Sequence, residues 1–535
     1  MSTAAMQAVH RPGAGLGPVL LDALQRHPGR VAMVDEMRAV TYAQLLDLVA
    51  QAARRLEALG QREGDVVAQL SGNRIEMFAV MAAAYIRGFC SVTLHPMASA
   101  GDHRQTLQDC QARVLISEPA YAERLFQEGG ELRLQHLSHE AGDHGFWHAA
   151  QDDAAAALAA RGTAESIIRL AYTGGTTGRA KGVMLSNRAM LSNAQLWLAG
   201  LAWPDGVRTL CSAPISHGAG SLIYPTLLRG GTVVLERGFE VGRWLDSVQR
   251  HRIAFTFIVP TMLYALLDDA RTSQADLRSL QALIYGASPA APARIAQALE
   301  RFGPVLVQTY GQSEAPNTLL LLDQQAHASA DARRLASAGK PFPGVELALL
   351  GEDGLPVAAG QVGEICVRGP LVMSGYLGLQ EQTAQALAGD YLHTGDLALQ
   401  DDQGYFYLVD RKKDMVISGG FNVYAREVED VLCAHPAVSQ VAVIGVPDAK
   451  WGEAVLAVVV CRDGQSVAAP TLQALVRAAK GPICTPKHVV FEAWLPLTGL
   501  GKPDKKALRA RFSQGLEASA PVDGAQRSAP GELTR

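Results

Sequence analysis

The stretch Tyr172-Thr-Gly-Gly-Thr-Thr-Gly-Arg-Ala-Lys-Gly182 carries the densest chemical pattern in the chain. It follows an apolar run, Ile167–Ala171, and combines four glycines, three threonines and a lysine. Glycines allow backbone N–H groups to approach a phosphate closely, the hydroxyls add donors, and the lysine adds positive charge. The spacing does not fit the G-x-x-x-x-G-K-[ST] pattern of a Walker A loop. The stretch predicts a phosphate-binding loop, with a flexible surface turn as the less favoured alternative.

Short apolar runs alternate with helical patterns on both sides of this loop. Residues 41–60 predict an amphipathic helix that Thr41 caps and Gly60 ends. Predicted strands are at 112–117, 209–215, 231–236, 255–260 and 282–286, and a helix is predicted at 293–302. This alternation is typical of α/β layers with mostly parallel sheets.

The second half of the chain changes character twice. Glycine-punctuated segments at 345–350, 363–368 and 405–409 predict a distorted β-barrel, and the charged run Asp410–Asp414 precedes a smaller βα pattern. In that smaller part, helices are predicted near 427–434 and 471–479, and strands near 441–445, 454–461 and 488–491. We therefore expect an α/β protein with a large N-terminal domain (1–409) of two layered α/β subdomains plus the distorted β-barrel. A hinge (410–413), a small mobile α+β C-terminal domain (414–512) and a disordered tail (513–535) complete the expected organisation.

Composition excludes several function classes. The 535 residues contain 48 Lys plus Arg against 52 Asp plus Glu, so the formal charge is −4, and no basic run suggests nucleic acid as a partner. Seven scattered cysteines predict reduced thiols. The longest apolar stretch, Phe78–Leu94, is interrupted by Arg87 and Gly88, which predicts a buried helix followed by a strand and no transmembrane segment. Residues 1–17 lack a secretory pattern, so a cytoplasmic protein is expected.

Four further motifs follow the glycine-rich loop in a fixed order. They are Tyr310-Gly-Gln-Ser-Glu314, Thr394-Gly-Asp396, Asp410-Arg411 followed by Gly419-Gly420, and Thr498-Gly-Leu-Gly-Lys502. Together with the loop they resemble the adenylate-forming superfamily, which includes acyl-CoA synthetases, peptide-synthetase adenylation domains and firefly luciferase. The resemblance extends from Leu20 to Phe512.

The resemblance implies roles for individual residues. Tyr310 flanks adenine, Ser313 lies near the α-phosphate, and Glu314 holds Mg²⁺. Asp396 grips the ribose hydroxyls, Arg411 contacts ribose or phosphate, and Lys502 bridges the acyl carboxylate and the α-phosphate. The catalytic set is Lys502, Glu314 and Thr173, and the other expected ATP or AMP contacts are Gly174, Thr176, Thr177, Lys181, Gly286, Ala287, Ser288, Gly311 and Gln312. The alternatives are a solvated loop carboxylate for Glu314, a turn aspartate for Asp396, a surface ion pair for Arg411 and a solvated charge for Lys502. For Gly286, Ala287 and Ser288, tight strand-to-loop packing is an equally good explanation.

The same resemblance places three more features. His217, Gly286 and Val307 would line the acyl pocket, although a histidine after an apolar strand is more often a satisfied buried side chain. Gly419 and Gly420 would line the channel for the pantetheine of coenzyme A, and Lys413 would be the hinge residue. Three positions depart from the family pattern without removing a charged group, namely Ala180, Tyr391 and Ala425.

These features predict an ATP-dependent acyl-CoA synthetase that uses Mg²⁺ and coenzyme A. A carboxylic acid reacts with ATP to give acyl-AMP and pyrophosphate, and coenzyme A then displaces AMP. A medium- or long-chain fatty acid is the expected substrate, and an aryl acid is the alternative substrate. The alternative reaction is that of an acyl-AMP ligase, which loads the acyl group onto a carrier protein. An oxygenase of luciferase type is disfavoured by Ile417, and a non-catalytic homologue by the presence of every charged group named above. A monomer or homodimer is expected.

Overall fold

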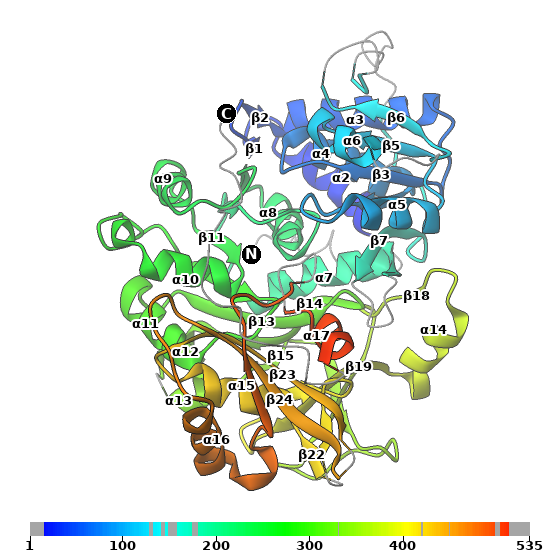
Figure 1. The fold of residues 1–535 in the computed structure, drawn as a ribbon. Coiled ribbons are helices and arrows are strands. Elements are labelled where there is room, and N and C mark those ends of the chain that lie inside the picture. The colour runs from blue at the N-terminus through cyan, green and yellow to red at the C-terminus, as the bar shows by residue number, and fades with distance from the viewer. Residues whose placement is uncertain are drawn as a thin grey trace. The chain divides into compact units, whose positions relative to one another are not determined.

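The computed structural model describes residues 15–127, 132–140, 145–147, 158–173, 180–329, 331–418, 421–448, 450–497 and 503–512. The chain divides into two compact units, Met1–Lys412 and Lys413–Arg535, here called the first and second units. The predicted tail at 513–535 lies outside the described residues. The α/β fold class is confirmed (Figure 1).

A mostly parallel sheet forms one half of the first unit. Its described strands are β1 (Val31–Val34), β2 (Ala39–Thr41), β9 (Arg208–Cys211), β10 (Thr232–Leu235), β11 (Phe255–Ile258), β12 (Ala282–Gly286), β13 (Leu306–Gln312), β14 (Ala315–Leu322) and β15 (Lys340–Pro341). Their order is β15-β14-β13-β12-β11-β9-β10-β1-β2, with β1, β9, β10, β11, β12 and β13 parallel. We call it sheet A.

A second mostly parallel sheet, sheet B, also belongs to the first unit. Its described strands are β3 (Val66–Leu70), β4 (Cys90–Thr93), β5 (Val114–Ser117), β6 (Gln135–Ser138), β7 (Ile167–Thr173), β8 (Lys181–Ser186) and β18 (Gly375–Tyr376). They lie in the order β18-β8-β7-β4-β3-β5-β6, and β8 and β18 run antiparallel to their neighbours. The predicted glycine-rich loop therefore joins the antiparallel pair β7 and β8.

Helices cover both sheets. They are α2 (Leu16–Arg26), α3 (Tyr42–Ala58), α4 (Ile75–Arg87), α5 (Ala100–Asp109), α6 (Pro119–Gln127), α7 (Asn187–Gly200), α8 (Ile223–Leu228), α9 (Val241–His251), α10 (Pro260–Asp268), α11 (Pro292–Phe302), α12 (Gln324–Ala328), α13 (Ala332–Leu335) and α14 (Gln380–Ala386). Short 3₁₀ turns are η2 (Gly218–Leu222), η3 (Ala270–Ser273) and η4 (Ala388–Asp390). As predicted, Thr41 caps α3 through a capping box with Gln44, and Gly60 has a φ of +81°.

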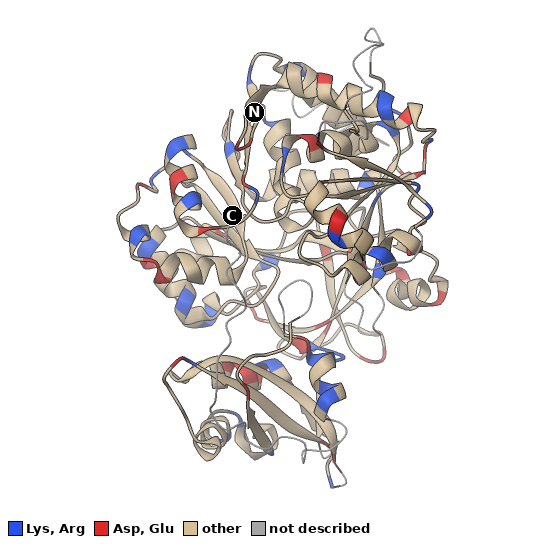
Figure 2. Cartoon of the chain, turned by 45° about the horizontal axis from the view of Figure 1, so that its top comes forward, with Lys and Arg blue, Asp and Glu red and all other residues tan. Residues whose placement is uncertain are grey.

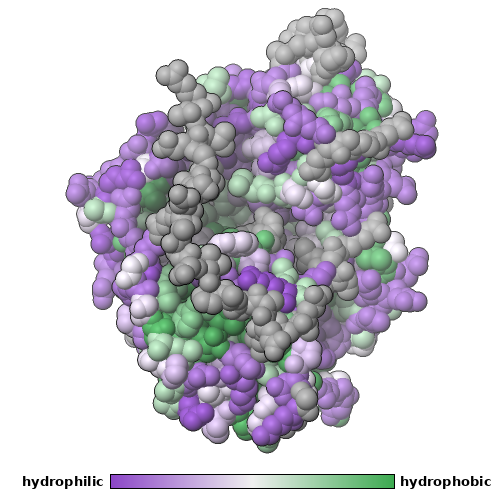
Figure 3. All heavy atoms as spheres, viewed as in Figure 1, coloured by the Kyte–Doolittle hydropathy of each residue, from purple (hydrophilic) through white to green (hydrophobic). Residues whose placement is uncertain are grey.

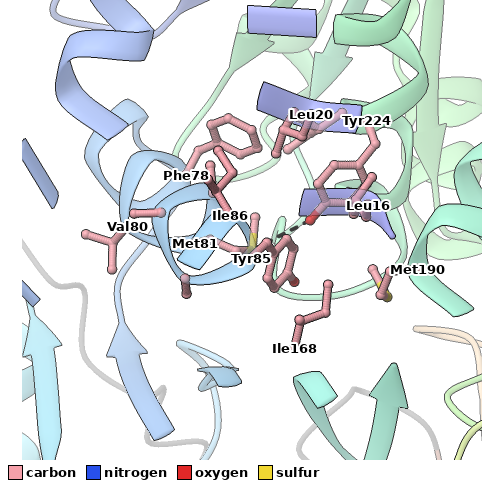
Figure 4. Close-up of a cluster of buried hydrophobic side chains, with 14 of the residues drawn as sticks. Leu16, Leu20, Phe78, Val80, Met81, Tyr85, Ile86, Ile168, Met190 and Tyr224 are labelled. Carbon is pink, nitrogen blue, oxygen red and sulfur yellow. Dashed lines mark hydrogen bonds between the residues drawn. The ribbon is translucent and has the colours of Figure 1, made fainter. Parts of the chain in front are cut away.

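The largest apolar core joins α2, α4, α7 and α8 to sheet B. Leu16 and Leu20 of α2 face Phe78, Met81 and Tyr85 of α4 in Figure 4. Tyr224 of α8 closes this cluster, and its hydroxyl donates to the Met81 sulfur at 3.8 Å. The apolar stretch from Phe78 is thus a buried helix, α4, followed by strand β4, as the sequence predicts.

Sheet A has two apolar faces. Leu283 and Tyr285 of β12 pack with α9, α10 and α11 on one face, whereas Ile284 packs with Phe257 and Val307 on the other. This alternation follows from the two-residue period of a strand. Two predicted strands end earlier than expected, because Pro214 cannot donate to a ladder and Pro260 begins α10.

An antiparallel sheet, sheet C, completes the first unit. Its described strands, in the order β16-β17-β19-β20, are β16 (Glu346–Leu350), β17 (Gly363–Arg368), β19 (Leu392–Gln400) and β20 (Phe406–Arg411). The register shifts between Glu364 and Cys366 and again between Leu397 and Ala398. These shifts distort the sheet at the place where it presents the Thr-Gly-Asp motif.

The second unit is a small α+β body. Its described strands are β21 (Val416–Ser418), β22 (Phe421–Val423), β23 (Val438–Asp448), β24 (Gly452–Cys461) and β25 (His488–Phe491), and its helices are α15 (Ala425–Cys433), α16 (Ala469–Cys484) and α17 (Lys505–Phe512). The paired strands β23 and β24 form its centre. Val443 and Val455 contribute to the core under α15 and α16.

Charges of both signs are interspersed along the helices of the first unit in Figure 2. Hydrophilic residues cover much of the face shown in Figure 3. Among the helices in the described ranges, none has both the length and the hydrophobicity needed to cross a membrane.

One buried side chain, Asn73, joins the carboxyl ends of the two parallel sheets. It follows β3 of sheet B, and its amide group donates to the carbonyls of Cys211, Ala213 and Glu236 at 3.3, 2.9 and 2.9 Å. Its oxygen accepts from the N–H of Ile215 at 2.9 Å. The residues that follow β9, including His217, are therefore fixed against sheet B.

We predict that Asn73→Ala lowers the free energy of unfolding of the first unit by about 2–4 kcal/mol, because it leaves buried N–H and C=O groups without partners. Urea unfolding followed by tryptophan fluorescence measures the change. Met37→Ala is the control, since Met37 is 90% exposed. An unchanged midpoint for Asn73→Ala would show that the two sheets do not depend on this side chain.

Candidate active site

A shared carboxylate, Asp396, organises the candidate site. The Tyr310 hydroxyl donates to Asp396 Oδ2 at 2.6 Å, and Arg411 Nε donates to Oδ1 at 3.1 Å. Asp396 is only 7% exposed, whereas about half of the Arg411 side chain is exposed. Burial, followed by the charge and hydrogen bond of Asp396, raises the pKa of Tyr310 well above its ordinary value. Two sequence motifs that are far apart in the chain thus meet at one carboxylate.

The local backbone explains why Asp396 takes this position. Gly395 has a φ of +72°, which favours glycine, and the Asp396 N–H donates to Thr394 Oγ1 at 3.1 Å. The Thr394 hydroxyl in turn donates to the carbonyl of Ile365 at 2.7 Å. Asp396 and Arg411 are direct partners across β19 and β20. The turn and the strand pair together bring the carboxylate beside the guanidinium.

A second cluster contains Glu314 and Lys181. Tyr376 donates to Glu314 Oε1 at 2.8 Å, and the Lys181 ammonium lies 4.6 Å from the centre of the Tyr376 ring. Burial, then the charge and hydrogen bond of Glu314, raises the pKa of Tyr376. The backbone N–H of Met373 also donates to the Glu314 carbonyl at 2.8 Å. The predicted metal ligand and the predicted loop lysine therefore share one tyrosine.

The ends of the predicted phosphate loop are held together. Thr173 pairs directly with Lys181 across β7 and β8. The predicted loop contacts Gly174, Thr176 and Thr177 lie outside the described residues. Gly419, Gly420 and Lys502 do so as well, so their predicted roles stay predictions.

Close backbone approaches surround the predicted adenine segment. A Cβ at Gly286 would lie 2.5 Å from the Thr309 carbonyl oxygen, and one at Gly311 would lie 2.5 Å from Asn317 N. The strand-to-loop junction after β12 has Ala287 in the left-handed region, with a φ of +68°. Glycine at 286 and 311 is thus explained by packing. Ser288, Gln312 and Ser313 are partly buried on the same two segments.

His217 lies in a tightly packed, half-buried environment. Its Nδ1 is 2.8 Å from the Ser216 hydroxyl, and its ring meets the His95 ring edge-on with centroids 4.7 Å apart. Burial, followed by the charges of His95 and Arg169, lowers the pKa of His217 to about 3. His217 is therefore a neutral imidazole at physiological pH.

The third predicted pocket residue, Val307, is fully buried. It lies on the face of sheet A that also carries Phe257 and Ile284. A Cβ at Gly218, next to His217, would be 3.2 Å from the Phe257 ring. The Phe257 ring therefore stands between the surroundings of His217 and the apolar layer that holds Val307. Lys413, the predicted hinge, is the first residue of the second unit.

Sequence reasoning missed three residues around these clusters. Tyr376, on the short strand β18, belongs to none of the sequence motifs. Arg169 precedes the loop on β7, and its guanidinium donates to the Ser216 carbonyl at 2.8 Å. Glu364 accepts from the Gly395 N–H at 2.9 Å, directly beneath the Asp396 turn. Each contact joins residues that are distant in the chain, so local pattern could not reveal it.

The low pKa of His217 makes stability depend on pH. In the unfolded chain histidine titrates near its ordinary value of about 6.5, so between that pH and about 3 the unfolded chain binds a proton that the folded chain does not. Folding stability must therefore fall as pH decreases through this window. We predict that His217→Gln reduces the slope of unfolding free energy between pH 6 and 4 by about 1.4 kcal/mol per pH unit.

Guanidinium unfolding at a series of pH values measures this slope. His435→Gln, in the second unit, is the control and should leave the acid sensitivity of the first unit unchanged. An identical slope in His217→Gln and the parental protein would mean that His217 does not stay neutral on folding.

Two family models match the chain. The model for the AMP-binding enzyme covers residues 20–377, and the model for the AMP-binding enzyme C-terminal domain covers residues 427–502. The first model contains Tyr310 and Glu314 and the second ends at Lys502, whereas Asp396 and Arg411 lie in the segment between the two models.

Curated relatives and solved structures agree with the family models. A medium/long-chain-fatty-acid–CoA ligase, FadD8, of Mycobacterium tuberculosis is 42% identical over 93% of this chain and 90% of its own length. A feruloyl-CoA synthase of an Amycolatopsis species is 38% identical over 93% of this chain and 99% of its own.

Among solved structures, the amide bond synthetase McbA of Marinactinospora thermotolerans has a TM-score of 0.84 at 34% identity, covering 93% of this chain and all of the other. The o-succinylbenzoate CoA synthetase MenE of Bacillus subtilis, solved with its acyl-adenylate, has a TM-score of 0.82 at 28% identity, covering 92% and 97%. The resemblance expected from the motifs is confirmed, and the chain belongs to the AMP-binding enzyme family of adenylate-forming enzymes.

Proposed function

We propose that this enzyme is an ATP-dependent acyl-CoA synthetase whose substrate is a medium- or long-chain fatty acid. The expected enzyme class, an AMP-forming acid–thiol ligase, is confirmed by the CoA ligases to which the chain is similar over most of its length. The observation that carries the proposed nucleotide site is the position of Asp396 between Tyr310 and Arg411.

Asp396 is suited to hold the ribose. A buried carboxylate with two oxygens can accept hydrogen bonds from both hydroxyls of a ribose, and such charged acceptors form strong bonds. Tyr310 and Arg411 orient it, and the half-exposed Arg411 guanidinium also offers N–H groups to a phosphate. Adenine then lies against the segments of Gly286 and Tyr310.

Glu314 fits the requirements of a magnesium ligand. Its Oε1 is fixed by Tyr376, and it is a hard oxygen donor on a partly exposed carboxylate. Mg²⁺ in ATP sites takes one or two carboxylates and completes its coordination with phosphates and water. Glu314 would hold the ion, which would neutralise phosphate charge. Lys181, held over the Tyr376 ring, adds positive charge on the same side.

A carboxylate is a poor electrophile, so it must be activated before a thiol can attack it. Positive groups are needed for that activation because the carboxylate and ATP are both negatively charged. The carboxylate oxygen attacks the α-phosphorus of ATP, the bond to pyrophosphate breaks, and an acyl-AMP anhydride forms. The hydroxyl of Thr173 and the ammonium groups of Lys181 and Lys502 offset the negative charge that gathers in this step. The thiol of coenzyme A then attacks the acyl carbon, AMP leaves, and the thioester forms.

The second half-reaction requires a different surface of the second unit. Lys502 and the pair Gly419-Gly420 both belong to that unit, and each serves a different step. We propose that the second unit rotates about Lys413, within a hinge at 410–413, so that Lys502 acts in adenylation and the glycine pair lines the pantetheine channel.

The apolar surroundings of the acyl site favour an apolar acid. The Phe257 ring beside Gly218 and the neutral His217 bring no fixed charge to the proposed acyl site, with Val307 in the apolar layer behind Phe257. The 42% identical relative is a medium/long-chain-fatty-acid–CoA ligase. The second candidate is an aryl acid, which the 38% identical feruloyl-CoA synthase supports. A cytoplasmic location, Mg²⁺ dependence and a monomeric or homodimeric state complete the proposal.

An acid panel tests the proposed reaction. Octanoate, dodecanoate and hexadecanoate are compared with benzoate and cinnamate, and AMP and thioester are measured by chromatography with and without coenzyme A. We predict AMP formation that requires both a fatty acid and coenzyme A. Activity only with the aryl acids would move the substrate to the second candidate. AMP release that requires an amine or a carrier protein in place of coenzyme A would contradict the synthetase.

The hinge is tested by Lys413→Pro, because proline fixes φ near −65° and restricts rotation. We predict that thioester formation falls at least about tenfold more than acid-dependent pyrophosphate exchange, since only the former needs the rotated arrangement. Lys413→Ala is the matched control, and it should retain both steps because alanine does not fix φ. Equal losses in the two assays for Lys413→Pro would oppose the rotation.

A further inference from the structure

A buried carboxylate, Glu364 on β17, lies at the centre of a network beneath the Asp396 turn. Its Oε1 accepts the backbone N–H of Gly395 at 2.9 Å, and its Oε2 lies 3.2 Å from His393 Nδ1 and 3.4 Å from Lys412 Nζ. The backbone N–H of Lys412 also donates to the Gly395 carbonyl at 2.9 Å. Glu364 therefore binds the N–H of Gly395, and the backbone of Lys412 binds its C=O.

The electrostatics show that this carboxylate is kept charged. Glu364 is 8% exposed, and burial alone would raise its pKa. The hydrogen bonds from His393 and Gly395 and the charge of Lys412 outweigh burial, so the pKa of Glu364 is below its ordinary value. A charged group under a turn costs free energy unless it is paired, which makes the ammonium of Lys412 part of the arrangement.

The donor atoms of Glu364, Cys366 and His393 also lie within 4.8 Å of one another, as in a metal site. The Lys412 ammonium, however, stands 3.4 Å from Glu364 Oε2 and supplies the positive charge that a metal ion would bring. Burial, followed by the charge of Glu364, raises the pKa of the Cys366 thiol to about 12, so the sulfur carries its proton. The cluster is better explained as a hydrogen-bonded anchor.

The place of Lys412 in the chain gives this anchor a role. Lys412 is the last residue of the first unit, and Lys413 is the first of the second. Gly395 is the residue before Asp396, and Arg411 is the residue before Lys412. The network therefore spans from the carboxylate proposed for ribose to the residue next to the proposed pivot.

We infer that Glu364 is a positioning residue for the nucleotide site. By holding Lys412 against the Gly395 turn, it keeps movement at the hinge from displacing Asp396. This inference rests on the proposed function. Rotation beyond Lys412 then leaves Asp396 and Arg411 in place, so the nucleotide remains gripped while the second unit changes its position. Glu364 touches neither substrate nor reacting atoms, and it acts through the turn.

A double-mutant cycle with Glu364→Gln and Lys412→Met tests the clamp in the full chain. Glutamine keeps an oxygen for the Gly395 N–H and removes the charge, and methionine keeps the length of the lysine side chain. The measurements are the Kd of AMP by calorimetry, and KM for ATP and kcat in acid-dependent pyrophosphate release. Hydrogen exchange of the peptide spanning 392–400 reports on the turn.

We expect each single change to weaken AMP binding and raise KM for ATP about three- to tenfold, while kcat for adenylation stays within about twofold. Exchange in the turn should become faster. The double variant should bind AMP with the same Kd as the single variant that binds it less tightly, because both changes break the same contact.

The matched control is the exposed pair Glu346 and Arg368 on the same sheet. Glu346→Gln and Arg368→Met, singly and together, should leave the AMP Kd and turn exchange unchanged. If the fold-changes in the Kd of AMP for Glu364→Gln and Lys412→Met multiply in the double variant, the two residues act independently and the clamp is wrong. An unchanged Kd of AMP with only a lower melting temperature would also overturn it. A parental protein that binds no AMP and forms no adenylate would instead refute the proposed function, so the two failures are distinguishable.

Discussion

The structure depends on one carboxylate, Asp396, that is almost completely buried. A buried polar group is tolerated only when hydrogen-bond partners compensate for the loss of water. Tyr310 and Arg411 provide those partners from two different strands, β13 of sheet A and β20 of sheet C. The carboxylate therefore joins two sheets and, at the same time, forms the polar centre of the proposed nucleotide site.

Around this centre, contacts within the first unit fix the other side chains of the proposed site. Asn73 fixes the two parallel sheets at their carboxyl ends, where α/β proteins bind ligands. Tyr376 fixes Glu314 beside Lys181, and Glu364 fixes the turn under Asp396. In the proposed cycle only Lys502 and the glycine pair exchange places, so the nucleotide need not be released between the two steps. Both side-chain partners of Asp396, Tyr310 and Arg411, lie before Lys413 and therefore belong to the first unit.

Much of the fold could be predicted from local pattern. Strands β12, β17 and β25 have the predicted bounds, because each is a compact apolar run ended by a turn or a charge. Strand β9 ends at Cys211 and is shorter than predicted. The residues after it, including Ala213 and Ile215, form a loop whose backbone hydrogen-bonds to the Asn73 side chain. The sequence correctly indicated that these residues are apolar, but hydrogen bonds to the distant Asn73 determine their backbone conformation.

The site shows the same limit. Asp396 and Tyr310 could be named because their motifs keep a fixed order in the chain, yet nothing in either motif predicted that they share a hydrogen bond. Tyr376 and Glu364 were missed because their importance comes from partners 62 and 31 residues away, Glu314 and Gly395. For Gly286 a ligand contact and tight packing were equally plausible from sequence, and for Gly311 only a ligand contact was predicted; the structure shows that a side chain at either position would collide with the backbone.

The most direct test of the account compares AMP with 2′,3′-dideoxy-AMP as calorimetric ligands for the parental enzyme and for Asp396→Ala. If Asp396 holds the ribose hydroxyls, the parental enzyme should bind AMP at least about tenfold more tightly than the dideoxy ligand, as expected for hydrogen bonds to a charged group. The Asp396→Ala variant should bind the two ligands equally. Equal affinity of the parental enzyme for AMP and 2′,3′-dideoxy-AMP would contradict the central role of this carboxylate.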